Sequence, residues 1–203
     1  MITLCMDTSN KFLILSLIRD DKIVSYRNIN SWKRQSELIF PELIKCLEEA
    51  HISSHEINQV VVTKGPGSYT GVRIAMTVAK VMCKMGNIPL YTLSSLQLIA
   101  SNKEEVAVVM DARGKRGYFA IYKKGVLIGK ESALSVDEIK SILDTHMDLE
   151  VLGDASILGL EDNYPNLCQS FLDLKSHWQL QENVDLLVPE YLKSNEEYLV
   201  KKS

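Results

Sequence analysis

The chain has 203 residues, of which 46% are apolar and 24% are charged, and its formal net charge is −3. This composition is that of one large folded domain or two small ones, and it argues against long disorder. The net charge argues against a strongly basic face for nucleic acid, but it leaves a local basic patch open. No apolar run approaches the ~20 residues of a membrane-spanning helix, and Asp7 interrupts the apolar start that a secretory signal would need.

Four cysteines lie far apart in the sequence and form no CxxC pair: Cys5, Cys46, Cys83 and Cys168. This spacing predicts free thiols rather than disulfides or a metal set, as is usual in the reducing cytoplasm.

The first half begins with three strand-like segments, at residues 2–6, 11–18 and 22–29. A helix is predicted within residues 35–50, with an apolar face, and the β-branched run at 57–63 is typical of a buried parallel strand. A glycine-rich loop and a second helix follow, to about Met85. A short strand at 88–93 and a serine-capped helix at 94–100 complete this half.

The pattern begins again at Val106. The stretch VAVVMD resembles ITLCMD, and Asp111 stands where Asp7 stood, 104 residues earlier. Further strands are predicted at 118–124, 126–131 and 149–153, with a helix at 136–143. Each half therefore reads βββαβ, which predicts a duplicated α/β unit with one lobe at residues 1–101 and another at 102–203.

The loop GPGSYTG is the most distinctive motif. It matches neither the phosphate-loop pattern GxxxxGK[ST] nor the dinucleotide pattern GxGxxG, because the third glycine comes one residue late. A strand, a glycine loop and a helix still suit a small anion. Two interpretations stay open: a sharp turn capped by Ser68 or Thr70, or an anion or nucleotide contact made by Asp7, Gly65, Gly67, Ser68, Thr70 and Gly71.

The helix at residues 71–85 is apolar over most of its circumference. At about 100° per residue, its polar side chains form one narrow stripe: Arg73, Thr77, Lys80 and Lys84. A helix with one face in water needs a smaller apolar arc. The pattern predicts either a helix buried inside the chain's own core or a helix that meets a partner protein.

Other candidate sites are weak. Asp7 and Asp111 each end a first strand, but the turns DTSN and DARG depart from the DxGT turn of nucleotide-binding folds, so each is interpreted as a turn cap. His51 and His55 have a zinc-like spacing without a third ligand. No catalytic set, metal site or cofactor is predicted.

Several motifs together resemble one known family. The stretches MDTS, RQSELIFPELI, KGPGSYTGVRIAMTVAK, PLYTLSSLQ, MDARGKRGYFAIY and VPEYLK are similar to the TsaB (YeaZ) family, which takes part in forming threonylcarbamoyladenosine in tRNA. The similarity covers the first ~125 residues and resumes at 189–193, and GPGSYTGVRIA is its most specific part.

The resemblance implies an α/β fold of the actin-like, sugar-kinase-like (ribonuclease H-like) class and a cytoplasmic, non-catalytic scaffold. It would bind the catalytic paralogue TsaD as a heterodimer, help to recruit the ATPase TsaE, self-associate through the same surface and meet tRNA only within the complex. The first two helices would form the interface. Its residues would be Leu38, Ile39, Glu42, Val72, Arg73, Ala75, Met76, Ala79, Lys80, Met82 and Cys83.

Two departures stand out. Many family members have histidine where this chain has Gln35, so the two-histidine metal site of TsaD-type proteins is absent. The region after Gly153 is also shorter than usual, which predicts a trimmed second lobe. The alternative is an active enzyme of the same fold, either a small-molecule kinase or a metal-dependent peptidase.

Overall fold

Two β-sheets carry the fold in this computed structural model, which describes residues 1–146 and 148–193. The first sheet has six strands in the order β10-β5-β4-β1-β2-β3. They are β1 (Ile2–Asp7), β2 (Phe12–Arg19), β3 (Lys22–Asn30), β4 (Gln59–Thr63), β5 (Leu90–Leu93) and β10 (Gln179–Leu180). The second sheet has four strands in the order β8-β7-β6-β9. They are β6 (Val106–Asp111), β7 (Arg116–Lys123), β8 (Val126–Ser135) and β9 (Glu150–Gly153).

The two sheets repeat one topology. In the first, β1 pairs antiparallel with β2 and parallel with β4, and in the second, β6 pairs antiparallel with β7 and parallel with β9. Asp7 and Asp111 end the two central strands at equivalent positions. The duplicated βββαβ order read from the sequence is therefore confirmed.

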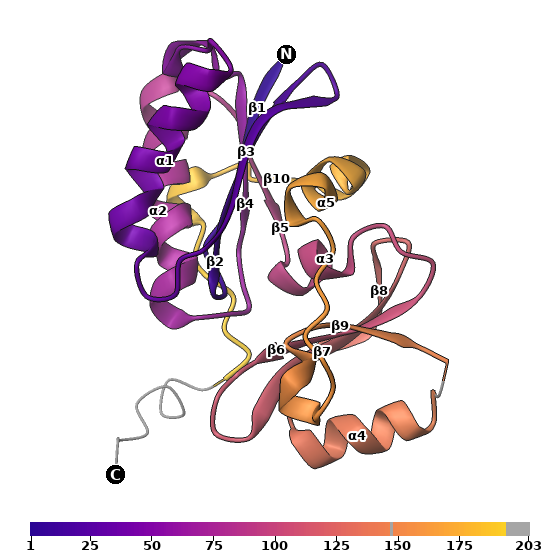
Figure 1. The fold of residues 1–203 in the computed structure, drawn as a ribbon. Helices are drawn as coiled ribbons and strands as arrows, with labels where there is room; N and C mark the ends of the chain where they lie inside the picture. The colour runs from indigo at the N-terminus through magenta and orange to yellow at the C-terminus, as the bar shows by residue number, and fades with distance from the viewer. Residues whose placement is uncertain (147, 194–203) are drawn as a thin grey trace.

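Helices cover the sheets in layers (Figure 1). The two long helices, α1 (Gln35–Glu49) and α2 (Tyr69–Gly86), lie on the outer face of the first sheet and share a core with it. Between the two sheets lie α3 (Ser95–Ala100) and α5 (Leu167–Asp173), in a core to which both sheets contribute. The remaining helix, α4 (Val136–Asp144), covers the far face of the second sheet. Because the middle core is shared, the lobes are packed against each other.

Four single turns of 3₁₀ helix complete the described elements. They are η1 (Ser54–Glu56), η2 (Ala155–Leu158), η3 (Lys175–His177) and η4 (Val184–Leu186). Of these, η4 packs against α2 in the first lobe.

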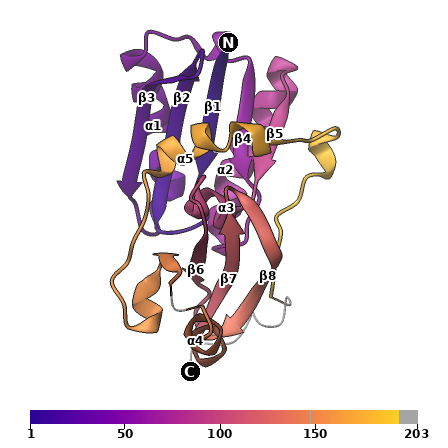
Figure 2. The same ribbon diagram turned by 90° about the vertical axis from the view of Figure 1, so that its right-hand side faces the viewer.

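The segment after β9 returns to the first lobe (Figures 1 and 2). Helix α5 packs against β2 and β3, and β10 pairs with β5. The boundary between residues 101 and 102 therefore separates the two halves of the duplication, and we propose it in this sense only. It does not describe where the last part of the chain packs, because this part completes the edge of the first sheet.

Candidate functional site

The glycine loop packs against the turn that follows β1. A Cβ atom added to Gly67 would lie 2.4 Å from the Ser9 carbonyl oxygen, and one added to Gly71 would lie 2.2 Å from the Thr8 carbonyl oxygen. The Thr8 hydroxyl donates to the Gly71 carbonyl at 2.6 Å and accepts from the Ala75 amide at 3.1 Å. Glycine at these two positions therefore lets the loop backbone touch the backbone of the turn after β1. This favours the interpretation of the motif as a sharp turn.

The helix after this loop begins as the sequence predicts. The Ser68 hydroxyl accepts from the Gly71 amide at 3.2 Å and caps α2, whereas Thr70 is exposed. Gly65 has a φ of 107°, and a Cβ there would lie 2.6 Å from the Glu190 carbonyl oxygen. Of the six candidate anion contacts, Gly67, Ser68 and Thr70 line the cleft between the two lobes.

Asp7 is buried and hydrogen-bonded within the fold. Its carboxylate accepts hydrogen bonds from the Thr63 hydroxyl and from the Ser9 amide. Burial raises the pKa of Asp7 above its ordinary value, although these hydrogen bonds oppose the shift. The carboxyl group thus holds the turn after β1 and does not face the cavity. An anion contact by the loop stays a prediction.

A cleft of about 870 Å³ lies between the two lobes. It is lined by the turn after β1, by the start of α2, by the β6–β7 loop and by the residues after β9. On its floor, the Lys11 ammonium lies 3.1 Å from Asp154 and 2.6 Å from Asp162. The Tyr164 hydroxyl donates to Asp154 at 2.6 Å. These ion pairs connect Lys11 of the first lobe to Asp154 and Asp162 of the second lobe.

Most residues of α2 that were expected at an interface are inside the chain's own core. Val72, Ala75, Met76, Ala79 and Cys83 are all at most 3% exposed. They face the first sheet because β4 and β1 lie directly beneath the helix. The prediction that these five side chains meet a partner therefore needs correction, since a partner could not reach them in the folded chain.

Three residues of the polar stripe of α2 contact the C-terminal segment. Lys84 forms an ion pair with Asp185, at 2.7 Å, and the Lys80 ammonium donates to the carbonyls of Asp185 and Leu187. Arg73 donates to the Tyr191 hydroxyl at 2.8 Å. The C-terminal segment therefore runs along the polar flank of α2.

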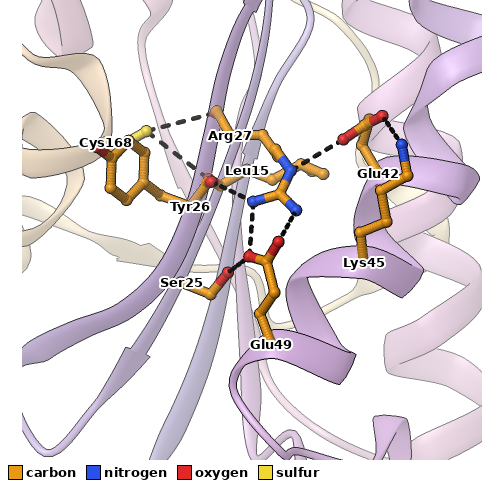
Figure 3. A network of polar contacts seen from close by, with 8 residues as sticks. All are labelled: Leu15, Ser25, Tyr26, Arg27, Glu42, Lys45, Glu49 and Cys168. Atoms are coloured by element: carbon orange, nitrogen blue, oxygen red, sulfur yellow. Dashed lines mark hydrogen bonds and ion pairs between the residues drawn. The ribbon is translucent and has the colours of Figure 1, made fainter.

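Helix α1 is held by an ionic network on its β3 side (Figure 3). Arg27 of β3 donates to Glu42 at 2.9 Å and to both oxygens of Glu49, at 2.6 and 2.9 Å. Lys45 donates to the other oxygen of Glu42 at 2.7 Å. Ion pairing with Lys45 and Arg27 lowers the pKa of Glu42, and Arg27 lowers that of Glu49.

Three further residues of α1 bear on the expected interface. Ile39 is only 1% exposed, so it is corrected as an interface residue, whereas Glu42 pairs with Arg27 and Lys45 and its contact with a partner stays a prediction. Leu38 is half-buried.

Gln35 stands at the position where relatives are expected to have histidine. It is buried, and its side-chain amide donates to the Asn10 carbonyl at 2.9 Å.

Both α1 and α2 carry exposed apolar side chains. On α1, Phe40 and Ile44 are 56% and 55% exposed and lie away from the flank that meets Arg27. On α2, Val81 and Met85 are 51% and 84% exposed and lie away from the flank that meets the C-terminal segment. The two helices run in the same direction, because α1 and α2 both start at the turn after β1 and contact each other. We call these four residues, together with the half-buried Ile74 and Leu47, the α1–α2 seam.

Sequence reasoning missed Phe40 and did not separate the exposed from the buried apolar positions of α2. A helical wheel of α2 places Val81 and Met85 opposite its buried residues, so part of this difference could be predicted. The wheel does not show which flank the C-terminal segment occupies, because that segment is distant in the sequence.

Neither a metal site nor a membrane-spanning helix is present in the described part of the chain. Within residues 1–146 and 148–193, no cluster of histidine, cysteine, aspartate or glutamate has the form of a metal site. No helix in the same part of the chain is long and apolar enough to cross a membrane.

Comparison with known proteins identifies relatives for this architecture. The protein-family model "TsaD: tRNA N6-adenosine threonylcarbamoyltransferase" matches residues 30–160. The tRNA threonylcarbamoyladenosine biosynthesis protein TsaB of Bacillus subtilis is 34% identical over 133 residues, which are 63% of this chain and 58% of that protein. TsaB of Buchnera aphidicola from Schizaphis graminum is 27% identical over 151 residues, which are 70% of this chain and 71% of that protein. The matched segment thus spans little more than half of the Bacillus protein.

The structure agrees with this family. YeaZ from Pseudomonas aeruginosa superposes with a TM-score of 0.72 at 20% identity, over 94% of this chain and 99% of that one. This likeness shows the fold, which is the actin-like, sugar-kinase-like one with its duplicated lobes. The chain therefore belongs to the family of the TsaD model, and within it the chain is similar to the proteins named TsaB.

Proposed function

We propose that this chain is a non-catalytic scaffold for the formation of N6-threonylcarbamoyladenosine in tRNA, and that it binds a catalytic TsaD-type paralogue in the cytoplasm. The names of its relatives support the pathway. The α1–α2 seam supports the scaffold role and is the observation on which the proposal rests.

The seam has the chemistry of a protein interface. Four large apolar side chains on two adjacent helices are each more than half exposed, and such clusters mark interaction sites on soluble proteins. Methionine and phenylalanine adapt well to a partner's surface. The partner should present an apolar helical face, as the equivalent helices of a TsaD-type paralogue with the same fold would. Two copies of this chain would self-associate through the same seam when that partner is absent.

The seam leaves other surfaces free for the ATPase TsaE, which we propose is recruited by the pair. Of the interface residues expected from the family, four stay accessible in whole or in part: Leu38, Arg73, Lys80 and Met82.

The test is a charge introduced at an exposed seam position. Val81→Glu would bury an unpaired carboxylate in the complex, at a cost of several kcal/mol, without disturbing the core of the free chain. We expect copurification with the TsaD-type protein to be lost while circular dichroism and thermal unfolding of the free chain stay normal. Ala79→Glu is unsuitable, because Ala79 is 0% exposed and the variant would unfold.

Val126→Glu is the matched control. Val126 is 54% exposed, as Val81 is 51% exposed, but it starts β8 in the second lobe. This variant should bind the TsaD-type protein normally. Wild-type affinity for Val81→Glu, or equal losses in both variants, would contradict an interface at the seam. Binding of Mg-ATP to the chain alone, with turnover, would instead support the kinase alternative.

A further inference from the structure

An exposed tryptophan stands between cations at the mouth of the interlobe cleft. Trp32, in the loop between β3 and α1, is 54% exposed and lines the cleft. The Lys33 ammonium lies 5.8 Å from the centre of its ring, and the Arg113 guanidinium lies 6.0 Å from it. Arg113 belongs to the β6–β7 loop of the second lobe, so the cluster spans the cleft.

The charges of this rim are not neutralised within the described chain. In residues 1–146 and 148–193, Lys33, Arg113 and the adjacent Lys115 form no ion pair, and all three are exposed. Arg34 differs, since Glu37 lies 3.2 Å away. Despite the net charge of −3, Lys33 and Arg113 thus lie beside Trp32 without an ion pair, and Lys115 follows two residues after Arg113.

The cleft below the rim carries carboxylates as well as cations. Lys11 is already held between Asp154 and Asp162, and Asp111, Arg116 and Lys193 also line the cavity. A compact polyanion such as a free nucleoside triphosphate would meet these carboxylates if it entered deeply. A polyanion that passes across the mouth would meet the rim cations instead.

We propose that a single-stranded segment of RNA binds across this rim, with one base stacked on Trp32 and its phosphates beside Lys33 and Arg113. An exposed aromatic ring flanked by cations is the arrangement that binds unpaired nucleotides, because stacking holds the base and the cations hold the backbone. The choice of RNA over another polyanion rests on the proposed function, in which the substrate is a tRNA. The chain would then touch the RNA itself as well as through its partner.

The experiment measures binding of a fluorescently labelled tRNA transcript, and of a single-stranded RNA oligonucleotide, to the full chain by anisotropy over a series of salt concentrations. We expect binding in the range of about 10⁻⁴ to 10⁻⁶ M, typical of electrostatic contacts. Trp32→Ala should weaken it by about tenfold, within the range for loss of one stacked base. Lys33→Glu with Arg113→Glu should lower the salt slope by about 1.4, since each single-strand phosphate contact contributes about 0.7.

The control reverses two exposed lysines away from the rim, Lys22→Glu with Lys140→Glu, and so changes the net charge equally. This variant should keep both the affinity and the salt slope. No RNA binding by the wild-type chain, or the same loss in both double variants, would overturn the proposal, as would full competition by equimolar ATP. Tight binding of blunt duplex RNA that is unaffected by Trp32→Ala would overturn it as well.

The result can be separated from the proposed function. Both rim variants keep the α1–α2 seam and should copurify with the TsaD-type protein. If the wild-type chain binds the TsaD-type protein but does not bind RNA, only the proposal of RNA binding at the rim is rejected. Loss of partner binding by Val81→Glu, with normal RNA binding, would leave the rim intact.

Discussion

The Lys84 ammonium lies 2.7 Å from the Asp185 carboxylate, and these residues stand 101 positions apart in the sequence. This contact, with those of Lys80 and Arg73, binds the C-terminal segment along α2. Leu187 follows in the same segment and is only 7% exposed, inside the core beneath α2. The segment is thus anchored by a buried leucine and oriented by exposed charges.

The buried leucine should contribute much more to stability than the ion pair. We expect Leu187→Ala to lower the free energy of unfolding by about 2–4 kcal/mol, because it removes buried apolar surface and leaves a cavity. Leu186→Ala is the control, since its neighbour Leu186 is 74% exposed and the change should stay within about 0.5 kcal/mol. Urea unfolding of both variants measures the difference. Equal stabilities would show that the segment is not packed as described.

Asp185→Asn should have little effect in the same urea experiment. Both side chains of its ion pair with Lys84 are more than half exposed, at 60% and 58%, and water screens such pairs.

The glycine loop gives a second prediction, which compares two glycines of the same helix. Alanine is normally the better helix former, so Gly86→Ala, at an end with ordinary contacts of 3.6 Å or more, should be neutral or stabilising by up to about 1 kcal/mol. Gly71→Ala should instead destabilise the chain by about 1–3 kcal/mol, because its new Cβ would lie 2.2 Å from a backbone oxygen that cannot move aside easily. Thermal unfolding measures both. A Gly71→Ala variant as stable as wild type would show that the two backbones are not in contact.

The sequence was sufficient for the features that depend on neighbouring residues. The strand repeat at Asp7 and Asp111, the Ser68 cap and the buried strand β4 all follow from local patterns, and the structure confirms them. Two features could not be predicted in this way. The C-terminal segment covers Lys80 and Lys84 from more than 100 residues away, and Arg113 approaches Trp32 only because the lobes pack together.

The same limit affected the interface residues. A helical wheel shows that α2 is apolar on several sides, but it cannot show which side its own sheet occupies. Ala79 and Val81 are both apolar and only two positions apart, yet one is 0% and the other 51% exposed. Burial by the rest of the fold decides which of them a partner can touch.

The Arg27 network predicts a change of stability with pH (Figure 3). The folded-state pKa values of Glu42 and Glu49 are lowered, from an ordinary value of 4.5. A lowered pKa means that the unfolded chain binds protons more readily, so stability rises with pH through this range. The contribution is therefore present above about pH 4.5 and is lost as the pH falls through the lowered folded-state values.

The variant Arg27→Met tests this contribution because methionine keeps much of the side-chain length without the charge. At pH 7 it should unfold at a lower urea concentration than wild type, since Glu42, at 11% side-chain exposure, keeps only Lys45 as a partner. At pH 3 the two urea midpoints should converge, because protonated carboxyl groups no longer gain from the guanidinium. Arg34→Met is the control: its pair with Glu37 is 65% and 66% exposed, so its midpoint should follow wild type at both pH values. A difference for Arg27→Met that is constant from pH 7 to pH 3 would mean that Arg27 stabilises α1 by packing alone.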